Sequence, residues 1–367
     1  MLYESLILVT EGAARYFARE QSEAPRHASP SARTGLDAII MKLGRVRLSV
    51  ADARDLAEGA LRGIGYENDE ARIIADHVID AAMCGYEYSG LAKILNVSES
   101  DHFRSPRQSM KVLRETEGSL AFDGGNNVGM LALFHAAQAT IDKTKAHGIA
   151  LVSVTNAWMS GRSAYYVEMI AKHRLVAIHT AASSPQVAPP GGIRPVLGTN
   201  PIAIGLPSAR GPIVFDMGTS AYMMTEVMLR ERLGELLPEG VALGPGGEPT
   251  RDPAAARRGA LLPFGGYKGF GLALMLQALG LLGGAESEYG YLFVAFRPDL
   301  LGPADAFERQ VTQLIERIKA MPRQPGIDEI RIPSERAFRS RERARREGLE
   351  IDRMVFDALV ALRARQG

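Results

Sequence analysis

A glycine-rich run at residues 261–271 combines residue types that suit an anion. It reads LLPFGGYKGFG and leads into an apolar stretch that ends at Leu282. Glycines let a backbone turn tightly and approach a ligand, and a helix that follows directs unpaired N–H groups at any phosphate placed there. Lys268 adds a mobile positive charge. The run indicates either an anion cradle or a glycine-rich connection that lets two elements pack closely.

No standard nucleotide motif accompanies this run. The P-loop pattern is absent, and no G-x-G-x-x-G follows a predicted strand and opens a helix with an acidic residue about 20 positions later. Histidines occur at positions 27, 77, 102, 135, 147, 173 and 179, without a pair at the i, i+4 spacing that places two ligands on one helix face. We therefore expect neither a Rossmann fingerprint nor a metal site.

The composition is that of an ordinary globular protein, with 46% apolar and 23% charged residues. A chain of 367 residues exceeds the ~250–300 at which single cores stop growing, so two packed domains are expected. The 43 basic and 42 acidic side chains create no net field, so neither nucleic acid nor a membrane is an expected partner. Cys84 is the only cysteine, which excludes intramolecular disulfides and favours the cytoplasm. We expect it to be a buried apolar residue, not a nucleophile.

The start of the chain differs from the rest. Its short apolar stretch at 6–9 is flanked by Glu4 and Glu11 without a preceding basic region, which argues against a signal peptide, and it is too short to span a membrane. Residues 21–34 are rich in Ser, Pro, Arg and Ala, so residues 1–45 are predicted to be a disordered extension. We hypothesise that the native protein begins at Met41.

Hydrophobic periodicity predicts helices at both ends of the chain and an α/β region between them. Ser49 and Asp52 form a capping signal for a helix that ends near Gly63, and a second helix spans 68–84. Strands are predicted at 119–122, 149–154, 176–179, 202–206, 213–215 and 290–296, with helices near 128–146, 162–173, 220–233, 270–283, 304–320, 335–347 and 351–364. This predicts a helical domain at 46–118, an α/β domain at 119–300, and C-terminal helices at 301–367 that pack back on the N-terminal helices.

Five separated segments together resemble one known family. They are SGRSAYYVEM (160–169), SSPQVAPPGG (183–192), VLGTNPIAIGLP (196–207), PIVFDMGTS (212–220) and LLPFGGYKGFGLALM (261–275). In order and spacing they are similar to the malate/L-lactate dehydrogenase family, which lacks a Rossmann fold. That family includes malate, sulfolactate and ureidoglycolate dehydrogenases, a diketogulonate reductase, and reductases of piperideine- and pyrroline-carboxylate. The likeness covers nearly everything after about residue 46.

The resemblance implies a fold and a reaction. It implies an α/β (α+β) protein with a central, mostly antiparallel NAD(P)-binding sheet, a helical domain built from both chain ends, and assembly into a homodimer. The implied reaction is hydride transfer between NADH or NADPH and a small carboxylate-bearing 2-imino or 2-keto (2-hydroxy) acid. The motifs leave the choice between NADH and NADPH open.

The resemblance also assigns contacts with the cofactor. In relatives the dinucleotide is contacted by the residues equivalent to Pro212, Ile213, Val214, Phe215, Asp216, Met217 and Gly218, to Tyr267 and Lys268, and to Glu335, Arg336 and Ala337. Lys268 and the helix behind it suit the pyrophosphate, and Arg336 suits a phosphate through its planar fork. Asp216 is predicted to belong to the site, although an aspartate at a strand end is also a common turn former.

The largest departures from the family lie at the reacting centre. Relatives end the second helix in G-x-x-S-H-G, whose histidine serves as general acid, whereas this chain reads GYEYSG at 85–90. Ser89 takes the place of the histidine, Tyr88 that of the serine, and Lys93 that of an arginine that holds the substrate carboxylate. A second family histidine, in N-x-N-H-F-G, is missing from NAWMSG at 156–161. Histidine titrates near neutrality and serine does not, so the proton route must differ.

Three interpretations remain open. In the first, an active reductase takes its proton from Tyr88 or Tyr86, with the tyrosine pKa lowered by Lys93 and with help from Glu87; an imine fits best because an iminium already carries its proton. In the second, the enzyme is an ordinary 2-keto-acid or 2-hydroxy-acid dehydrogenase with the same residues. In the third, the chain is a catalytically silent, nucleotide-binding or structural partner subunit, in which the tyrosines are core or interface aromatics, Ser89 is a turn residue and Lys93 is a surface cation.

Overall fold

The computed structural model describes residues 44–283 and 289–366. Nearly all of the predicted disordered extension, and the hypothesised start at Met41, therefore lie outside the described residues. Val46–Gly367 forms one compact unit. Among the helices of the described part of the chain, none is long and apolar enough to cross a membrane.

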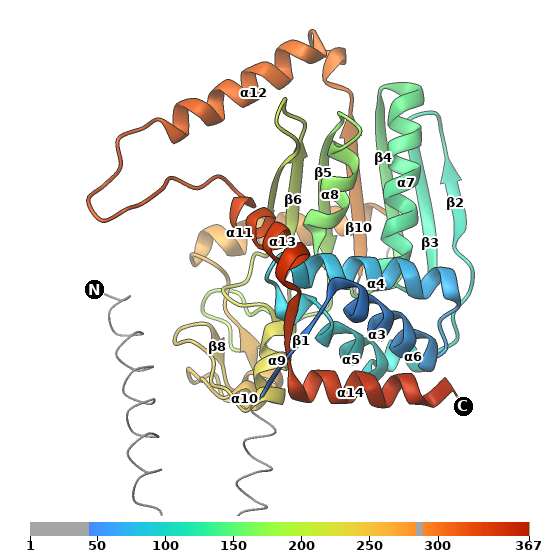
Figure 1. Cartoon of the computed structure of the whole chain (residues 1–367), viewed down its shortest axis with the longest axis vertical. Coiled ribbons are helices and arrows are strands. Elements are labelled where there is room, and N and C mark those ends of the chain that lie inside the picture. Colours follow the sequence, from blue (N-terminus) through green and yellow to red (C-terminus); the bar gives the residue numbers. More distant parts are fainter. Residues whose placement is uncertain (1–43, 284–288, 367) are drawn as a thin grey trace, which may run out of the picture. The chain divides into compact units, whose positions relative to one another are not determined.

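A seven-stranded sheet forms the centre of this unit, in the order β2-β3-β4-β10-β5-β6-β7 (Figure 1). Its strands are β2 (Lys111–Glu115), β3 (Ser119–Val128), β4 (Ile149–Trp158), β5 (Val176–Ala182), β6 (Ile202–Leu206), β7 (Ile213–Met217) and β10 (Gly290–Phe296). Only β3 and β4 pair in parallel, and every other neighbouring pair is antiparallel. The predicted mostly antiparallel sheet is therefore confirmed.

Helices cover both faces of this sheet. Helices α7 (Gly129–His147) and α8 (Ser163–Ala171) pack on one face, where Val152, Val154 and Phe293 are fully buried. α7 also provides the crossover that a parallel β3–β4 pair requires. Helix α11 (Tyr267–Gly280) packs on the other face at β5 and β10, where a Cβ on Gly280 would collide with Ala182.

A second core joins helices from both ends of the chain. It contains α3 (Val50–Gly63), α4 (Asn68–Met83), α5 (Ala92–Glu99) and α14 (Arg353–Arg363), and Figure 1 shows α14 beside α3 and α5. The side chain of Ser49 accepts a hydrogen bond from the Asp52 amide and caps α3, as predicted. Cys84, directly after α4, is a buried free thiol, which was also predicted.

The remaining elements connect these two parts. They are the helices α6 (Asp101–Arg104), α9 (Met224–Leu233), α10 (Pro253–Arg258), α12 (Ala304–Lys319) and α13 (Glu335–Glu347), the short strands β1 (Arg45–Leu48), β8 (Ala242–Leu243), β9 (Ala260–Leu261) and β11 (Leu349–Asp352), and the 3-10 turns η1 (Glu87–Ser89), η2 (Leu281–Gly283), η3 (Pro298–Leu300) and η4 (Ala364–Gln366). β1 pairs with β11, and β8 pairs with β9. α11 begins three residues earlier than the predicted 270, directly after two glycines with positive φ, so Tyr267 and Lys268 form its first turn.

Candidate active site

A cleft of about 460 Å³ lies between η1, the start of α8, β7 and the segment that precedes α13. We call it the main cleft. It brings together four residues that the sequence assigns to catalysis, Tyr86, Tyr88, Ser89 and Asp216. The residues that line it are Tyr86, Tyr88, Ser89, Gly161, Arg162, Ser163, Ala164, Pro201, Phe215, Asp216, Met217, Gly218, Met223, Pro333 and Ser334.

A smaller cavity of about 150 Å³ adjoins the main cleft. We call it the inner pocket. The two cavities share Ser89, Gly161, Pro201 and Met223, so these residues separate or join the two spaces. The inner pocket is also lined by Lys93, Met159, Ser160, Ala181, Ser183, Gln186, Thr199, Met224, Thr225, Met228, Tyr289 and Tyr291.

Lys93 is the only charged side chain among the described residues that line the inner pocket. It is 4% exposed, and the described part of the chain offers it neither a hydrogen bond nor an ion pair. Burial lowers the pKa of its ammonium to about 8. The alternative in which Lys93 is a surface cation is therefore wrong. A buried cation without a partner is costly unless a ligand supplies the counter-charge.

The rings of Tyr86 and Tyr88, at the start of η1, pack edge to face with their centroids 6.2 Å apart. The guanidinium groups of Arg162 and Arg336 lie over the ring of Tyr86, at 5.5 and 5.4 Å. Burial raises the pKa of Tyr88, and the nearby carboxylate of Glu226 raises it further. The expected lowering of this pKa by Lys93 is therefore wrong, and Tyr88 stays protonated at neutral pH.

Asp216 lines the main cleft and contacts the start of α8 directly. Its Oδ2 accepts a hydrogen bond of 2.7 Å from the Ala164 amide, so the carboxylate stabilises the N-terminus of that helix. Burial raises the pKa of Asp216, while the bond from Ala164 and the charge of Arg162 oppose this rise. Asp216 lies within β7 and not in a turn, so its position is fixed by the sheet.

Two buried polar atoms at the start of α8 lack a hydrogen-bond partner among the residues that the structure describes. They are Oγ of Ser163 and Nη2 of Arg162, and both residues line the main cleft. The preceding turn is tightly built, because His77 Nε2 accepts the Arg162 amide at 2.8 Å and a Cβ on Gly161 would come within 2.2 Å of that nitrogen. Unpaired donors beside a helix N-terminus suit the oxygen atoms of a bound phosphate or ribose. The sequence interpretation missed Arg162 and Ser163, although SGRS was part of one quoted motif.

The predicted cofactor residues divide into three groups. Phe215, Asp216, Met217 and Gly218 line the main cleft, and Arg336 stacks on Tyr86 at its edge. Pro212, Ile213 and Glu335 line a cavity of about 190 Å³ that adjoins the main cleft at Pro333. Val214 and Ala337 are buried, and Tyr267 and Lys268 line none of these cavities. Tyr267 is 75% exposed.

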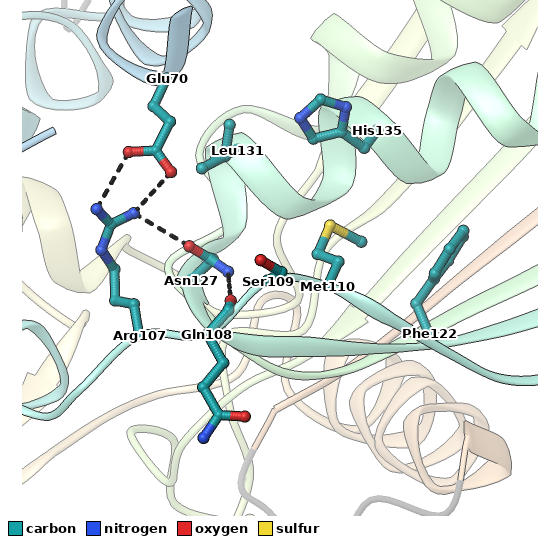
Figure 2. Close-up of a pocket in the computed structure, with 9 residues that line it drawn as sticks. All are labelled: Glu70, Arg107, Gln108, Ser109, Met110, Phe122, Asn127, Leu131 and His135. Carbon is teal, nitrogen blue, oxygen red and sulfur yellow. Dashed lines mark hydrogen bonds and ion pairs between the residues drawn. The ribbon is translucent and has the colours of Figure 1, made fainter. Parts of the chain in front are cut away.

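A separate cavity of about 410 Å³ lies between the start of α4, residues 107–110, β3 and α7 (Figure 2). Arg107 forms two bonds of 3.1 Å with the Glu70 carboxylate and a third with Asn127 (Figure 2). The charge of Arg107 is already neutralised by Glu70, and none of the predicted site residues lines this cavity. The cavity is therefore a weaker candidate for the active site than the main cleft and the inner pocket.

Comparisons with known proteins agree with this geometry. Residues 48–360 match the family model described as malate/L-lactate dehydrogenase. The chain belongs to the malate/L-lactate dehydrogenase family. As a member of this family it is an oxidoreductase, and the family implies a nicotinamide cofactor. The resemblance inferred from the five motifs is thereby confirmed.

Curated relatives and solved structures support the same assignment. L-sulfolactate dehydrogenase of Methanothermobacter thermautotrophicus is 30% identical, over 86% of this chain and 96% of its own length. Delta(1)-pyrroline-2-carboxylate reductase of Ancylobacter novellus is 33% identical, over 86% and 97%. The structure of sulfolactate dehydrogenase from Methanocaldococcus jannaschii, 29% identical, matches 88% of this chain and 98% of its own, with a TM-score of 0.77.

Proposed function

We propose that this protein is an NAD(P)H-dependent oxidoreductase that transfers hydride to or from a small carboxylate-bearing 2-imino or 2-keto (2-hydroxy) acid. The observation that supports this most is the junction of two cavities at Ser89. One cavity holds the buried, unpartnered ammonium of Lys93, and the other holds the unpartnered donors of Ser163 and Arg162. An anionic substrate in the inner pocket would therefore lie beside a dinucleotide in the main cleft.

The cofactor supplies hydride when it is bound. The side chains of Ser163 and Arg162 would hold its oxygen-bearing groups, and the exposed edge of β7 at Phe215 and Met217 would contact it. Lys93 would hold the substrate carboxylate and orient the carbon that reacts. Because Lys93 is buried in a pocket whose other described lining residues are uncharged, its contact with the carboxylate would be stronger than in water.

The proton donor differs from that of relatives, because Ser89 does not titrate usefully. Tyr88 and Tyr86 line the main cleft beside Ser89 and are the proposed donors. The raised pKa of Tyr88 keeps its proton in place until hydride transfer creates a strongly basic oxygen or nitrogen. An iminium substrate already carries its proton, so it depends least on this weak acid.

Replacing Tyr88 with phenylalanine is expected to lower kcat by roughly 10²-fold or more with a 2-keto acid, as for loss of a general acid, and by less with a cyclic imino acid. Steady-state kinetics with the two substrate classes measure this difference. Tyr86→Phe is the matched variant, because both rings line the same cleft. Unchanged turnover in both variants would place the proton donor elsewhere.

We also propose a homodimer, in which α11 contributes to the contact. This helix exposes Tyr267, Leu274, Met275 and Leu279 at helical spacing, next to the exposed Leu282. Such an apolar stripe is costly in water unless a second surface covers it. Met275→Glu is expected to shift sedimentation from dimer to monomer, whereas Leu301→Glu, at a side chain that is 89% exposed on another segment, leaves the dimer intact. A monomeric parent protein would disprove this proposal.

Separate titrations with NADPH and NADH test the main proposal. We expect saturable binding of at least one cofactor, seen as quenching of the Trp158 fluorescence and a gain of nicotinamide fluorescence. Trp158 is buried directly before Met159 of the inner pocket, so its emission reports on this region. Binding must be followed by oxidation of the cofactor with a 2-imino or 2-keto acid.

The loss of both family histidines favours one alternative, a catalytically silent nucleotide-binding or structural partner subunit. It predicts cofactor binding without turnover, or no binding at all. We keep the cytoplasm as the proposed location, because Cys84 is a free thiol.

A further inference from the structure

The N-terminus of α9 opens into the inner pocket. Its first residues, Met224 and Thr225, line the pocket together with the N-cap residue Met223. No side chain of the described residues caps this helix, and the Glu226 amide donates to the Met223 carbonyl, so the amides of Met224 and Thr225 remain available to a ligand. Glu226, the acidic residue of this turn, is bonded to Tyr222 and does not line the pocket. The partial positive charge of the helix start therefore acts on the cavity.

Lys93 provides a second, independent sign that the inner pocket receives an anion. Its side chain comes from α5, a different element, and is buried without a partner among the described residues. Two sources of positive charge thus meet in one small cavity that contains no carboxylate among its described lining residues. One carboxylate would satisfy both.

The rest of the inner pocket suits an uncharged group, because Lys93 is the only charged side chain among the described residues that line it. Four methionines line it, at positions 159, 223, 224 and 228, with Ala181 and Pro201. Its remaining polar groups are neutral hydroxyls and one amide. Arg162 lines the main cleft and not the inner pocket, and its Nη1 is already paired with Asp80. A second anionic group inside the inner pocket would therefore lose its water and find no cation among the described residues that line it.

We propose that the inner pocket is a subsite for one anionic group, in which Lys93 and the N-terminus of α9 receive a single carboxylate and the uncharged lining receives an uncharged remainder. The enzyme would then select monocarboxylic 2-imino or 2-keto acids with short or cyclic uncharged side chains. It would reject dianions such as oxaloacetate. This inference rests on the proposed function, since it names the substrate class of the same site.

Unreactive ligands of matched shape test the subsite apart from catalysis. Calorimetric titrations compare pyrrole-2-carboxylate, pyrrole-2,4-dicarboxylate and pyrrole-2-carboxamide, with the full chain alone and saturated with the nicotinamide that it binds. We expect the monocarboxylate to bind at least about ten-fold more tightly than the other two, because a charge-assisted contact is worth roughly 1.5–3 kcal/mol. Equal affinities for the mono- and dicarboxylate, or no binding of the monocarboxylate, would overturn the inference.

A backbone variant tests the contribution of α9. Met224→Pro removes one amide at the first helical position, where proline is tolerated, and the extended Met223 (φ −90°, ψ 135°) already has the backbone that precedes a proline. Met224→Leu is the matched control, because it changes the side chain but keeps the amide. We expect about ten-fold weaker binding of pyrrole-2-carboxylate by the proline variant than by the leucine variant, with pyrrole-2-carboxamide unaffected. Equal affinities of the two variants for the monocarboxylate would remove the helix from the subsite.

The two proposals can fail separately. Failure of both NADH and NADPH to bind would count against the oxidoreductase proposal, and the titrations of the protein alone would still decide the subsite. Cofactor binding and turnover without discrimination between mono- and dicarboxylate would reject only the subsite. Melting temperature and cofactor affinity verify that each variant is folded.

Discussion

Replacing Lys93 with methionine is expected to raise the melting temperature of the protein while removing most of its affinity for substrate. Burial shifts the pKa of this ammonium from 10.5 to about 8. At ~1.4 kcal/mol per pKa unit, the folded state carries a cost of roughly 3 kcal/mol for keeping this charge at neutral pH. Methionine has a similar length, and the pocket is already lined by four methionines, so it should pack without a cavity.

The pH dependence of the parent protein follows from the same shift. The unfolded chain holds the Lys93 proton up to about 10.5, and the folded chain loses it above about 8, so this residue makes stability rise with pH between these values. The methionine variant should lack this rise. Substrate affinity of the parent should instead fall above pH 8, because the free enzyme then loses the cation that holds the carboxylate.

Thermal denaturation between pH 7 and pH 10, together with KM at each pH, measures both effects. The exposed Lys111 on β2 provides the control, since Lys111→Met should change neither the melting temperature nor KM appreciably. A lower melting temperature in the Lys93 variant would show that its charge is compensated in the folded protein.

Replacing Arg341 with leucine is expected to destabilise the protein by about 3–5 kcal/mol, the usual cost of removing one partner of a buried ion pair. Arg341, on α13, donates two hydrogen bonds of 2.7 Å to the Glu168 carboxylate of α8, and it lies 3.0 Å from Asp80 of α4. All three side chains are largely buried. In the variant, the buried carboxylates of Glu168 and Asp80 would lose the guanidinium that neutralises part of their charge.

Urea denaturation measures this loss, and Arg345→Leu on the same helix is the control. Arg345 is exposed and pairs only with the neighbouring Glu342, so its removal should cost under about 1 kcal/mol. A loss equal to that of the control would show that the buried arginine contributes no net stability.

The free energy of unfolding at acidic pH provides a second measurement. Burial alone would raise the pKa of Glu168, but hydrogen bonds and charge from Arg341 and Lys172 lower it from 4.5 to about 2. The stability from this pair is therefore complete above pH 4.5 and is lost as pH falls towards 2. In the leucine variant the pKa of Glu168 should rise, because the lowering by Arg341 is gone while burial still raises it, so the loss of stability in acid should be smaller than in the parent protein.

Asp80, which contacts Arg341, also forms an ion pair with Arg162 of the main cleft. Loss of Arg341 should therefore disturb the position of Arg162, and the leucine variant should bind the cofactor less tightly than the parent protein.

Most of the sheet could be predicted from sequence because its buried strands carry apolar runs. The residues of β3, β4, β5, β6, β7 and β10 all overlap predicted strands. Strand β2 was missed, because Lys111–Glu115 is an exposed edge strand without alternation of polar and apolar residues. Helix α5 was missed as well, because its eight residues are too few for a clear helical period.

The site was only partly predictable. Motif positions identified Tyr86, Tyr88, Ser89 and Asp216, which the fold brings to one cleft. The burial of Lys93 and its isolation from counter-ions depend on α9 and β10, which lie far away in sequence, so no local pattern reports them. The glycine-rich run begins α11, and Tyr267 and Lys268 line none of the cavities described above, so their contact with the cofactor stays a prediction.

The position of β10 has a consequence for folding during synthesis on the ribosome. This strand lies between β4 and β5, yet it is made more than 100 residues after them in the chain, from residue 290 onwards. Until it emerges, the nascent chain holds two half-sheets whose facing edges have open backbone groups, the kind of edge that pairs with other chains. Synthesis of about the last fifth of the protein therefore completes the sheet and removes these open edges.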